Sequence, residues 1–194
     1  MVVTAGGGGD ERLVVRADGT WLTERAGSVV VEELAQAAHD DSTPIRQVLE
    51  ADGLTLAEQK LTSLNGAFHH DDLFIDVPAH VTVQQPLRVV HLFSVLAQQA
   101  LFPMTLIRIG EGSTVTLIDE YASLSGTPTQ TMHAPTHLVN GRIELLVAPG
   151  ATVHYVRLQR WDVQAREFLL QRATVGAGAT LTMANINLGA GLSK

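Results

Sequence analysis

The chain has 194 residues and a formal net charge of −7, with no run rich in lysine and arginine. Nucleic acids and anionic membranes bind proteins through basic patches, so neither is expected as the main partner. Cysteine is absent, which excludes disulfides, thiolate ligands and a cysteine nucleophile within this chain. Because the sequence contains neither an apolar stretch of about 18 residues nor a signal-peptide pattern, we expect a cytoplasmic protein.

The N-terminal segment, residues 1–20, is rich in glycine and is expected to be flexible. A short β-hairpin is predicted over Leu13–Glu24, because Asp18-Gly19 is a turn signal within a loosely alternating pattern. Residues 21–72 are predicted to form an N-terminal helical segment.

Three helices are predicted in this segment. The first covers Val30–His39, and the second begins at Thr43 and ends before Gly53. The third starts at a capping box, Thr55–Glu58, in which the hydroxyl and the carboxylate each satisfy a free backbone N–H. We expect this third helix to end near Asn65-Gly66.

After Asp72 the pattern changes to short runs rich in β-forming residues, separated by glycine, proline or small polar residues. Helix signals are missing from residue 73 onward, which excludes a sheet built from alternating strands and helices. Residues 73–194 are therefore predicted to form a β core. The predicted strands are Leu73–Val77, Val81–Val83, Leu87–Leu92, Thr105–Ile109, Thr114–Ile118, Arg142–Val147, Thr152–Leu158, Phe168–Val175 and Thr180–Ile186.

A repeated segment occurs three times in this core. Gly110–Ile118, Ala148–Val156 and Gly176–Ala184 align without gaps, and Val77–Val83 is a looser copy. Each of the three segments that align without gaps has a glycine, a small residue, a threonine and then mainly hydrophobic residues. The glycines stand at 112, 150 and 178, so the intervals are 38 and 28 residues, which is typical of repeat architectures.

The repeat favours a mainly β fold, a right-handed parallel β-helix (solenoid) that follows the short N-terminal helical segment. Glycine permits a sharp corner with positive φ, and the threonine begins a strand whose alternate aliphatic residues point inward. One coil cannot bury its own inner face, so coils stack on one another. The alternative is an antiparallel sandwich or barrel, but this region contains one Asn-Gly hairpin signal, Asn140-Gly141, where a sandwich should show more.

An ordered series of segments over residues 25–194 resembles the SufB/SufD family of iron–sulfur cluster assembly proteins. The similar segments are Leu64–Phe68 with Asp72–Pro78, Pro86–Leu92, Val115–Tyr121, Tyr155–Gln159 and Leu188–Lys194. The last of these resembles an element found midway through the family's core. We therefore expect the chain to be a truncated form or a naturally short relative, with residues 73–194 as the N-terminal portion of a longer core.

The resemblance implies a scaffold and interaction component, partner of SufB-like and SufC-like ATPase subunits, and not an enzyme. The short helical lead-in and the missing cysteines favour SufD over SufB. The family's late-coil histidine and cysteine positions have no counterpart here, so no catalytic, cofactor-binding or metal-binding residue is assigned, and an iron–sulfur cluster is expected only with a partner chain. Self-association into a homodimer is predicted through an uncapped strand edge or through a flank of the solenoid.

Four groups of residues were weighed as candidates for chemistry. His133 and His137 have a helical metal-ligand spacing, but Pro135 and the absence of helix signals remove its meaning. His69–Asp72 is expected to be a solvated loop, because neighbouring residues on an extended chain point apart. For the same reason Asp119-Glu120 is not expected to pair as glycosidase acids. His91 and His154 each stand alone within a strand pattern, so each is expected to be hydrogen-bonded or partly exposed rather than a ligand or a base.

Two rival functions remain open. One is a β-solenoid carbohydrate-active enzyme of the exported type. Sugar sites use aromatic rings, so the presence of only two tryptophans and two tyrosines argues against this enzyme. The other is a structural solenoid with an unrelated partner.

Overall fold

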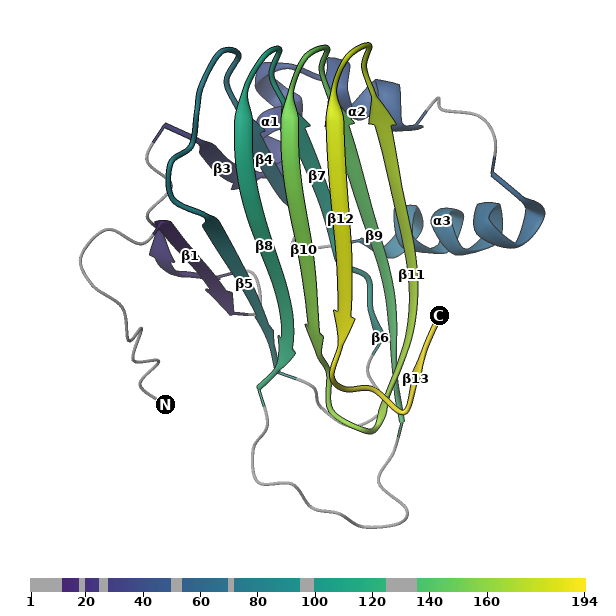
Figure 1. The fold of residues 1–194 in the computed structure, drawn as a ribbon. Helices are drawn as coiled ribbons and strands as arrows, with labels where there is room; N and C mark the ends of the chain where they lie inside the picture. Colours follow the sequence, from purple (N-terminus) through teal and green to yellow (C-terminus); the bar gives the residue numbers. More distant parts are fainter. Residues whose placement is uncertain are drawn as a thin grey trace.

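The computed structural model of the chain describes residues 12–17, 20–24, 28–49, 54–69, 72–94, 100–124 and 136–194. These residues form two facing β-sheets, called sheet A and sheet B, and three helices (Figure 1). The protein is mainly β, and most strand pairs are parallel.

Sheet A has the strand order β12-β10-β8-β5-β1-β2, and sheet B has the order β13-β11-β9-β7-β4-β3, with β6 beside β9. The bounds in sheet A are β1 Arg12–Ala17, β2 Thr20–Glu24, β5 Leu87–Phe93, β8 Thr114–Ser123, β10 Thr152–Arg160 and β12 Thr180–Asn187. Those in sheet B are β3 Val30–Glu33, β4 Leu73–Val77, β6 Ala100–Leu101, β7 Met104–Ile109, β9 His137–Val147, β11 Ala165–Val175 and β13 Leu192–Ser193.

From β4 onward the chain alternates between the two sheets, except that β6 and β7 both belong to sheet B, and successive main strands of a sheet are parallel. The repeats predicted from the sequence lie in register, because Thr152 pairs with Thr114 on one side and with Thr180 on the other. At the N-terminal end each sheet finishes with an antiparallel strand, β2 in sheet A and β3 in sheet B. The prediction of parallel, stacked repeats rather than an antiparallel sandwich is thus confirmed at the level of strand pairing.

The glycine corners are as the repeat predicts. Gly112, Gly150 and Gly178 have φ values of 62°, 71° and 68°, a region that other residues seldom adopt. The looser copy places His80 at the equivalent corner, also with positive φ, at 59°. Backbone groups bond between corners, since Gly112 N donates to Pro149 O and Gly150 N donates to Ala177 O, both over 3.0 Å.

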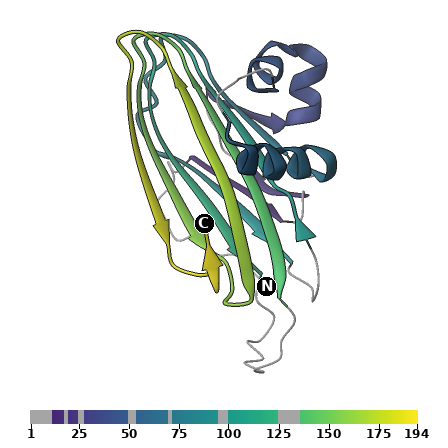
Figure 2. The same cartoon turned by 90° about the vertical axis from the view of Figure 1, so that its right-hand side faces the viewer.

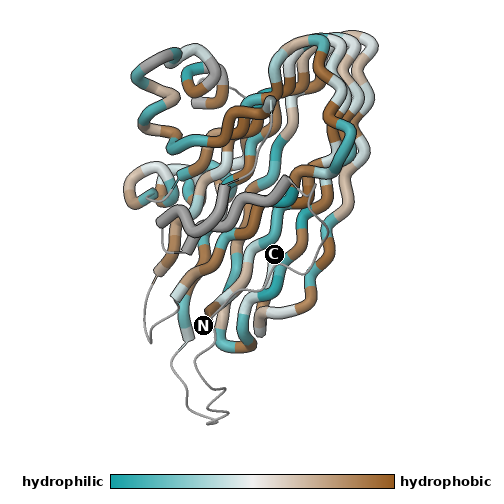
Figure 3. The backbone as a smooth tube through the Cα atoms, turned by 90° about the vertical axis from the view of Figure 1, so that its left-hand side faces the viewer, coloured by the Kyte–Doolittle hydropathy of each residue, from teal (hydrophilic) through white to brown (hydrophobic). Residues whose placement is uncertain are grey.

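The main core lies between the two sheets. It consists of inward-facing aliphatic residues of successive strands, among them Ile75, Leu87, Leu117, Leu145 and Val153, each with at most 1% of its surface exposed. Hydrophobic and hydrophilic residues alternate along the strands (Figure 3), as expected where one face of a sheet is buried and the other is not.

The three helices all lie on the outer face of sheet B (Figure 2). They are α1 Leu34–Asp40, α2 Thr43–Leu49 and α3 Leu56–Phe68. A second apolar cluster joins α1 and α2 to this face, in which Leu34, Ala37, Ile45 and Val48 cover Phe74, Met104, Leu106 and Leu146. Within the described ranges, no helix is long and apolar enough to span a membrane.

The helical segment differs from the prediction in two respects. Val30–Glu33 is a strand rather than the start of a helix, because these residues pair with β4 of sheet B. The capping box at Thr55 is present, but α3 continues through Asn65 to Phe68. Asn65 does not end the helix because its amide donates to the carbonyls of Pro103 and Asn140 in sheet B, over 3.3 and 2.8 Å.

The N-terminal hairpin and two short β segments can also be compared with the prediction. Leu13–Glu24 forms the expected hairpin from β1 and β2, and β1 also joins sheet A, so this part of the segment predicted to be flexible is a strand. Residues 1–11 and 18–19 lie outside the described ranges. Val81–Val83 contributes an isolated bridge at Thr82 instead of a strand, and Asn140-Gly141 lies within β9 rather than in a hairpin turn.

A matched pair of glycine substitutions tests the corners. Gly150→Ala should lower the free energy of unfolding by about 1–2 kcal/mol, because the added methyl disfavours a left-handed backbone. The nearest atoms to such a Cβ lie 3.9 Å away, so steric overlap contributes little. Gly66→Ala in α3, where a Cβ meets no atom within 4 Å, should raise stability by about 0.5–1 kcal/mol. Urea unfolding measures both; equal effects of the two changes would contradict the corner assignment.

Candidate functional site

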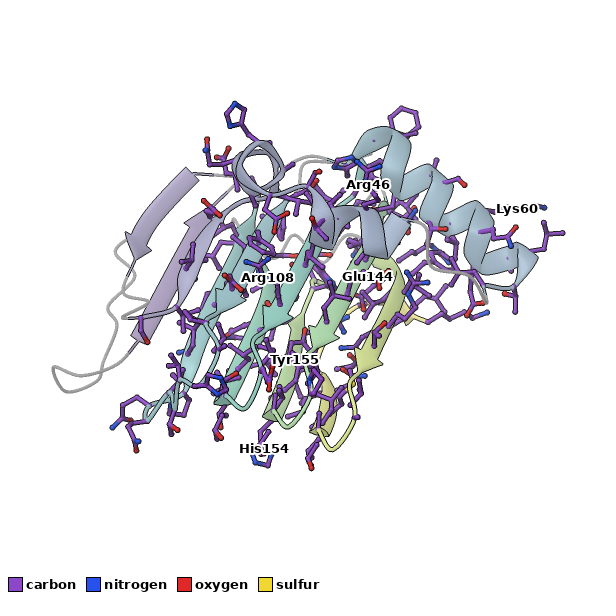
Figure 4. The ribbon with its side chains drawn as sticks, turned by 90° about the horizontal axis from the view of Figure 1, so that it is seen from above. Arg46, Lys60, Arg108, Glu144, His154 and Tyr155 are labelled. Carbon is purple, nitrogen blue, oxygen red and sulfur yellow. The ribbon has the colours of Figure 1, made fainter. Side chains whose placement is uncertain are left out.

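Polar side chains enter the space between the sheets at the end remote from the glycine corners. We call them the core polar cluster: His91, Thr105, Asp119, Tyr121, Tyr155, Arg157, Gln159, Trp161 and Glu167. Every member has at most 4% of its surface exposed. In Figure 4 Tyr155 lies between the two sheets. They occupy inward-facing positions because alternate residues of a strand share a face.

The first half of the cluster is centred on Asp119. His91 Nε2 donates to its Oδ1 over 2.9 Å, and the Tyr155 hydroxyl donates to its Oδ2 over 2.7 Å. The ring of His91 stacks on Tyr121 with centroids 4.4 Å apart, and the Tyr121 hydroxyl shares a 2.7 Å hydrogen bond with Thr105. Burial, reinforced by the Asp119 charge, raises the pKa of Tyr155 and of Tyr121 well above the ordinary value.

The second half is centred on Glu167. Its carboxylate pairs with Arg157, and it accepts hydrogen bonds from Trp161 Nε1 over 2.7 Å and from Ser193 Oγ over 2.8 Å. The guanidinium of Arg157 also lies 5.4 Å from the centre of the Tyr121 ring, which links the two halves. A buried charge is tolerated only when it is paired and hydrogen-bonded, and the Glu167 carboxylate meets both conditions.

Beside the cluster is a cavity of about 10 Å³, lined in part by Tyr121, Arg157, Trp161 and Glu167. A space of this size holds about one water molecule. The acids, the imidazole and the hydroxyls therefore contact each other rather than a space for a substrate. Such a network can fix the relative position of the two sheets.

Two further ionic groups lie on the outer face of sheet B and hold the helices. Arg108 pairs with Asp76 over 2.8 Å and reaches Asp41, between α1 and α2, over 3.1 Å. Arg172 pairs with Glu144 over 2.9 Å and donates to the carbonyl of Val48 in α2 over 2.8 Å. Figure 4 shows Arg108 and Glu144 on the side of the sheets that carries the helices.

The outer face of sheet A carries a third ionic group, Arg88–Glu120–Arg160, which spans β5, β8 and β10. Arg88 Nε donates to Glu120 Oε2 over 3.1 Å, and Arg160 Nη1 donates to Oε1 over 2.9 Å. Burial acts to raise the pKa of Glu120, but hydrogen bonds from both arginines outweigh it and lower this pKa below the ordinary value. Glu120 points outward and Asp119 inward, so the two acids do not converge, as the sequence predicts.

The histidine candidates that the structure describes lie in different parts of the fold. His133, His70 and Asp71 lie outside the described residues. His137 is buried at the start of β9, with Nε2 3.4 Å from Asp162 Oδ1, and His69 contacts Asp72 after α3. His154 points away from the sheets on the outer face of sheet A (Figure 4).

Within the described residues, no group of three or more histidine, aspartate or glutamate side chains could hold a metal ion. Sequence reasoning missed Arg157, Glu167 and Trp161. A signal for Arg157 was present, since it stands at an inward position of the alternating run Tyr155–Gln159. The partners of Arg157 come from other strands and could not be read from that run.

The structure thus defines a β protein of two facing sheets, each made mostly of parallel strands, with a buried polar cluster between them and helices on one outer face. The family described as "SUF system FeS cluster assembly, SufBD core domain" matches residues 92–194, more than half of the chain. The iron-sulfur cluster assembly protein SufD of Bacillus subtilis (strain 168) is 28% identical over 127 residues, which are 66% of this chain. The match covers 27% of that relative, so the chain spans about a quarter of its length.

The chain belongs to the SufBD core family of the SUF iron–sulfur cluster assembly system. The resemblance seen in the sequence is therefore confirmed, and the matched region contains β7 to β13 with most of the core polar cluster.

The Tyr155–Asp119 hydrogen bond can be tested by a double-mutant cycle. Tyr155→Phe should destabilise the protein by about 1–3 kcal/mol, because it leaves a buried carboxylate oxygen without its donor. Combined with Asp119→Asn, the loss should be smaller than the sum of the single losses, by about 0.5–3 kcal/mol. Chemical unfolding of the four proteins provides the values. Additive losses would show that the two groups are independent.

A pH dependence follows from His137. Burial lowers its pKa, and Asp162 opposes this only in part, so the folded state favours the neutral imidazole. The unfolded state then binds more protons, and stability should decrease as pH falls through the unfolded value of about 6.5. In denaturant titrations at pH 7.5 and pH 5.5, His137→Leu should reduce this decrease. His154→Leu, at an exposed position, controls for loss of an imidazole; an equal change in both variants would contradict the role of His137.

Proposed function

We propose that this chain acts as a non-catalytic, SufD-like scaffold in iron–sulfur cluster assembly and that it pairs with SufB-like and SufC-like subunits in the cytoplasm. The observation that carries the proposal is the SufBD core match over residues 92–194, together with the SufD relative. The absence of cysteine in the sequence favours SufD-like over SufB-like identity, and it requires that thiolate ligands of any cluster come from a partner chain.

The architecture that we propose is a right-handed parallel β-helix. The support comes from the alternation of strands between sheets A and B and from the in-register parallel pairs of Thr114, Thr152 and Thr180. Parallel strands joined by a crossover connection are right-handed in nearly all proteins. In this arrangement each repeat contacts its neighbours, so the stack presents extended faces and edges to partners.

The contacts of the candidate acids support a scaffold more than the rival carbohydrate-active enzyme. The candidate acids Asp119 and Glu120 are engaged by His91, Tyr155 and two arginines, and they point to opposite faces. The aromatic residues of the same cluster, Tyr121, Tyr155 and Trp161, are at most 3% exposed and cannot stack on a sugar face.

We also propose self-association through the strand edge of β12. This strand pairs with β10 on one side, and in the described part of the chain no strand pairs with its other side. Met183 and Ile186 on β12 are 37% and 43% exposed. An exposed strand edge with apolar residues favours pairing with a further strand.

Co-purification tests the proposal. The chain should co-elute with a SufB-like protein of the same genome and with its SufC-like ATPase, and in the absence of both it should be larger than a monomer by light scattering. A β-rich protein of similar size serves as the control bait. Failure to co-elute would contradict the scaffold role, and release of reducing ends from a glycan panel would support the carbohydrate-active rival.

A further inference from the structure

The outer face of sheet A carries an apolar patch. In the parallel register, Val156 lies beside Ile118 and Leu158 lies beside Ile186. We call these four residues the sheet A patch; Glu120 on β8 lies beside Leu158 and separates it from Val90 on β5. Arg88 and Arg160 flank it with side chains 45% and 57% exposed. The other half of the same face is polar, with Thr116, His154 and Thr182 in one row.

Apolar residues on the outer face of sheet B are covered by the chain's own helices. Leu34, Ile45 and Val48 pack on Phe74, Met104 and Leu106, which become fully buried. Among the residues that the structure describes, no helix lies on the corresponding face of sheet A, which faces the viewer in Figure 1 with the helices behind. The sheet A patch is therefore half-buried at Ile118, Val156 and Leu158 and exposed at Ile186.

The ionic groups repeat the same difference. On sheet B, Arg108 pairs with the strand residue Asp76 and uses another N–H to reach Asp41 beside the helices. On sheet A, Arg88 and Arg160 pair with the strand residue Glu120 in the same way, but their outer N–H groups face solvent. The arrangement of strand acid and arginine is shared by the two faces, while among the described residues the helix and its acceptor are found on sheet B alone.

We propose that the sheet A patch is a docking surface for an amphipathic helix of a partner protein that carries acidic side chains next to its apolar stripe. The apolar stripe packs on Val156 and Leu158, and a carboxylate accepts hydrogen bonds from Arg88 or Arg160. Two arginines beside one glutamate leave this face with a local positive charge on a chain whose net charge is −7, which complements an acidic helix. Recognition of an amphipathic helix through its apolar face is a common mode of peptide binding.

The test uses three synthetic peptides of equal length and the intact chain. One is a helix with leucines at positions i, i+3, i+4 and i+7 flanked by glutamates, one has lysines in place of the glutamates, and one is a scrambled acidic peptide. Fluorescence anisotropy should show saturable binding of the acidic helix and of neither other peptide. The affinity should decrease at high salt, because salt screens the charges. No binding, or equal binding of the acidic and basic helices, would overturn the proposal.

Matched substitutions locate the site. Leu158→Gln should weaken binding of the acidic helix about tenfold, because it removes apolar contact, whereas His154→Gln on the polar half of the same strand should leave binding unchanged. Arg160→Gln should weaken binding about two- to fivefold, whereas Arg166→Gln, an exposed arginine on β11 of sheet B, should not. Thermal unfolding by circular dichroism verifies that each variant is folded.

Two further results would overturn the proposal. One is a change of mass by light scattering in Leu158→Gln without binding of the acidic helix, which would indicate a second copy of this chain. The other is unaltered peptide binding in Leu158→Gln. The peptide experiment contains no SUF subunit. Failure of the peptides to bind therefore does not affect the co-purification test of the proposed function, and failure of co-purification does not affect the proposed helix-binding site.

Discussion

The structure depends on parallel, in-register pairing between successive repeats. The start of each strand in sheet A donates its backbone N–H to the preceding corner: Thr152 N bonds to Ser113 O, and Thr180 N bonds to Ala151 O, each over 2.8 Å. The corner glycines bond in the opposite direction, since Gly112 N donates to Pro149 O and Gly150 N donates to Ala177 O of the following corner. Since side-chain direction alternates along a strand, this pairing places equivalent residues of each repeat in one row, inward or outward.

Rows of equivalent residues explain why polar groups can be buried here. His91, Asp119 and Tyr155 come from three neighbouring strands of sheet A, and each takes the inward position of its own strand. Glu167 faces them from sheet B and pairs with Arg157. A one-residue shift of register would turn these groups to the opposite face and leave their partners unsatisfied, so the cluster specifies the register of the stack.

The two outer faces differ although both combine apolar residues with arginine–carboxylate pairs. The helices α1 and α2 of the N-terminal segment cover apolar residues of sheet B, whereas the sheet A patch is partly exposed. In a scaffold protein, an exposed apolar face with charged residues beside it is a feature of an interaction surface. The SufBD family assignment and the sheet A patch thus support the same kind of role from separate observations.

The sequence by itself determined the mainly β core, the capping box at Thr55 and the glycine corners at 112, 150 and 178, because each is a local pattern with a local physical cause. The tertiary structure decided that Val30–Glu33 is a strand, since its partner β4 lies some forty residues away along the chain. It also decided the partners of Asn65, Asp119 and Glu167, because such hydrogen bonds join residues that only the stacking of the strands brings together.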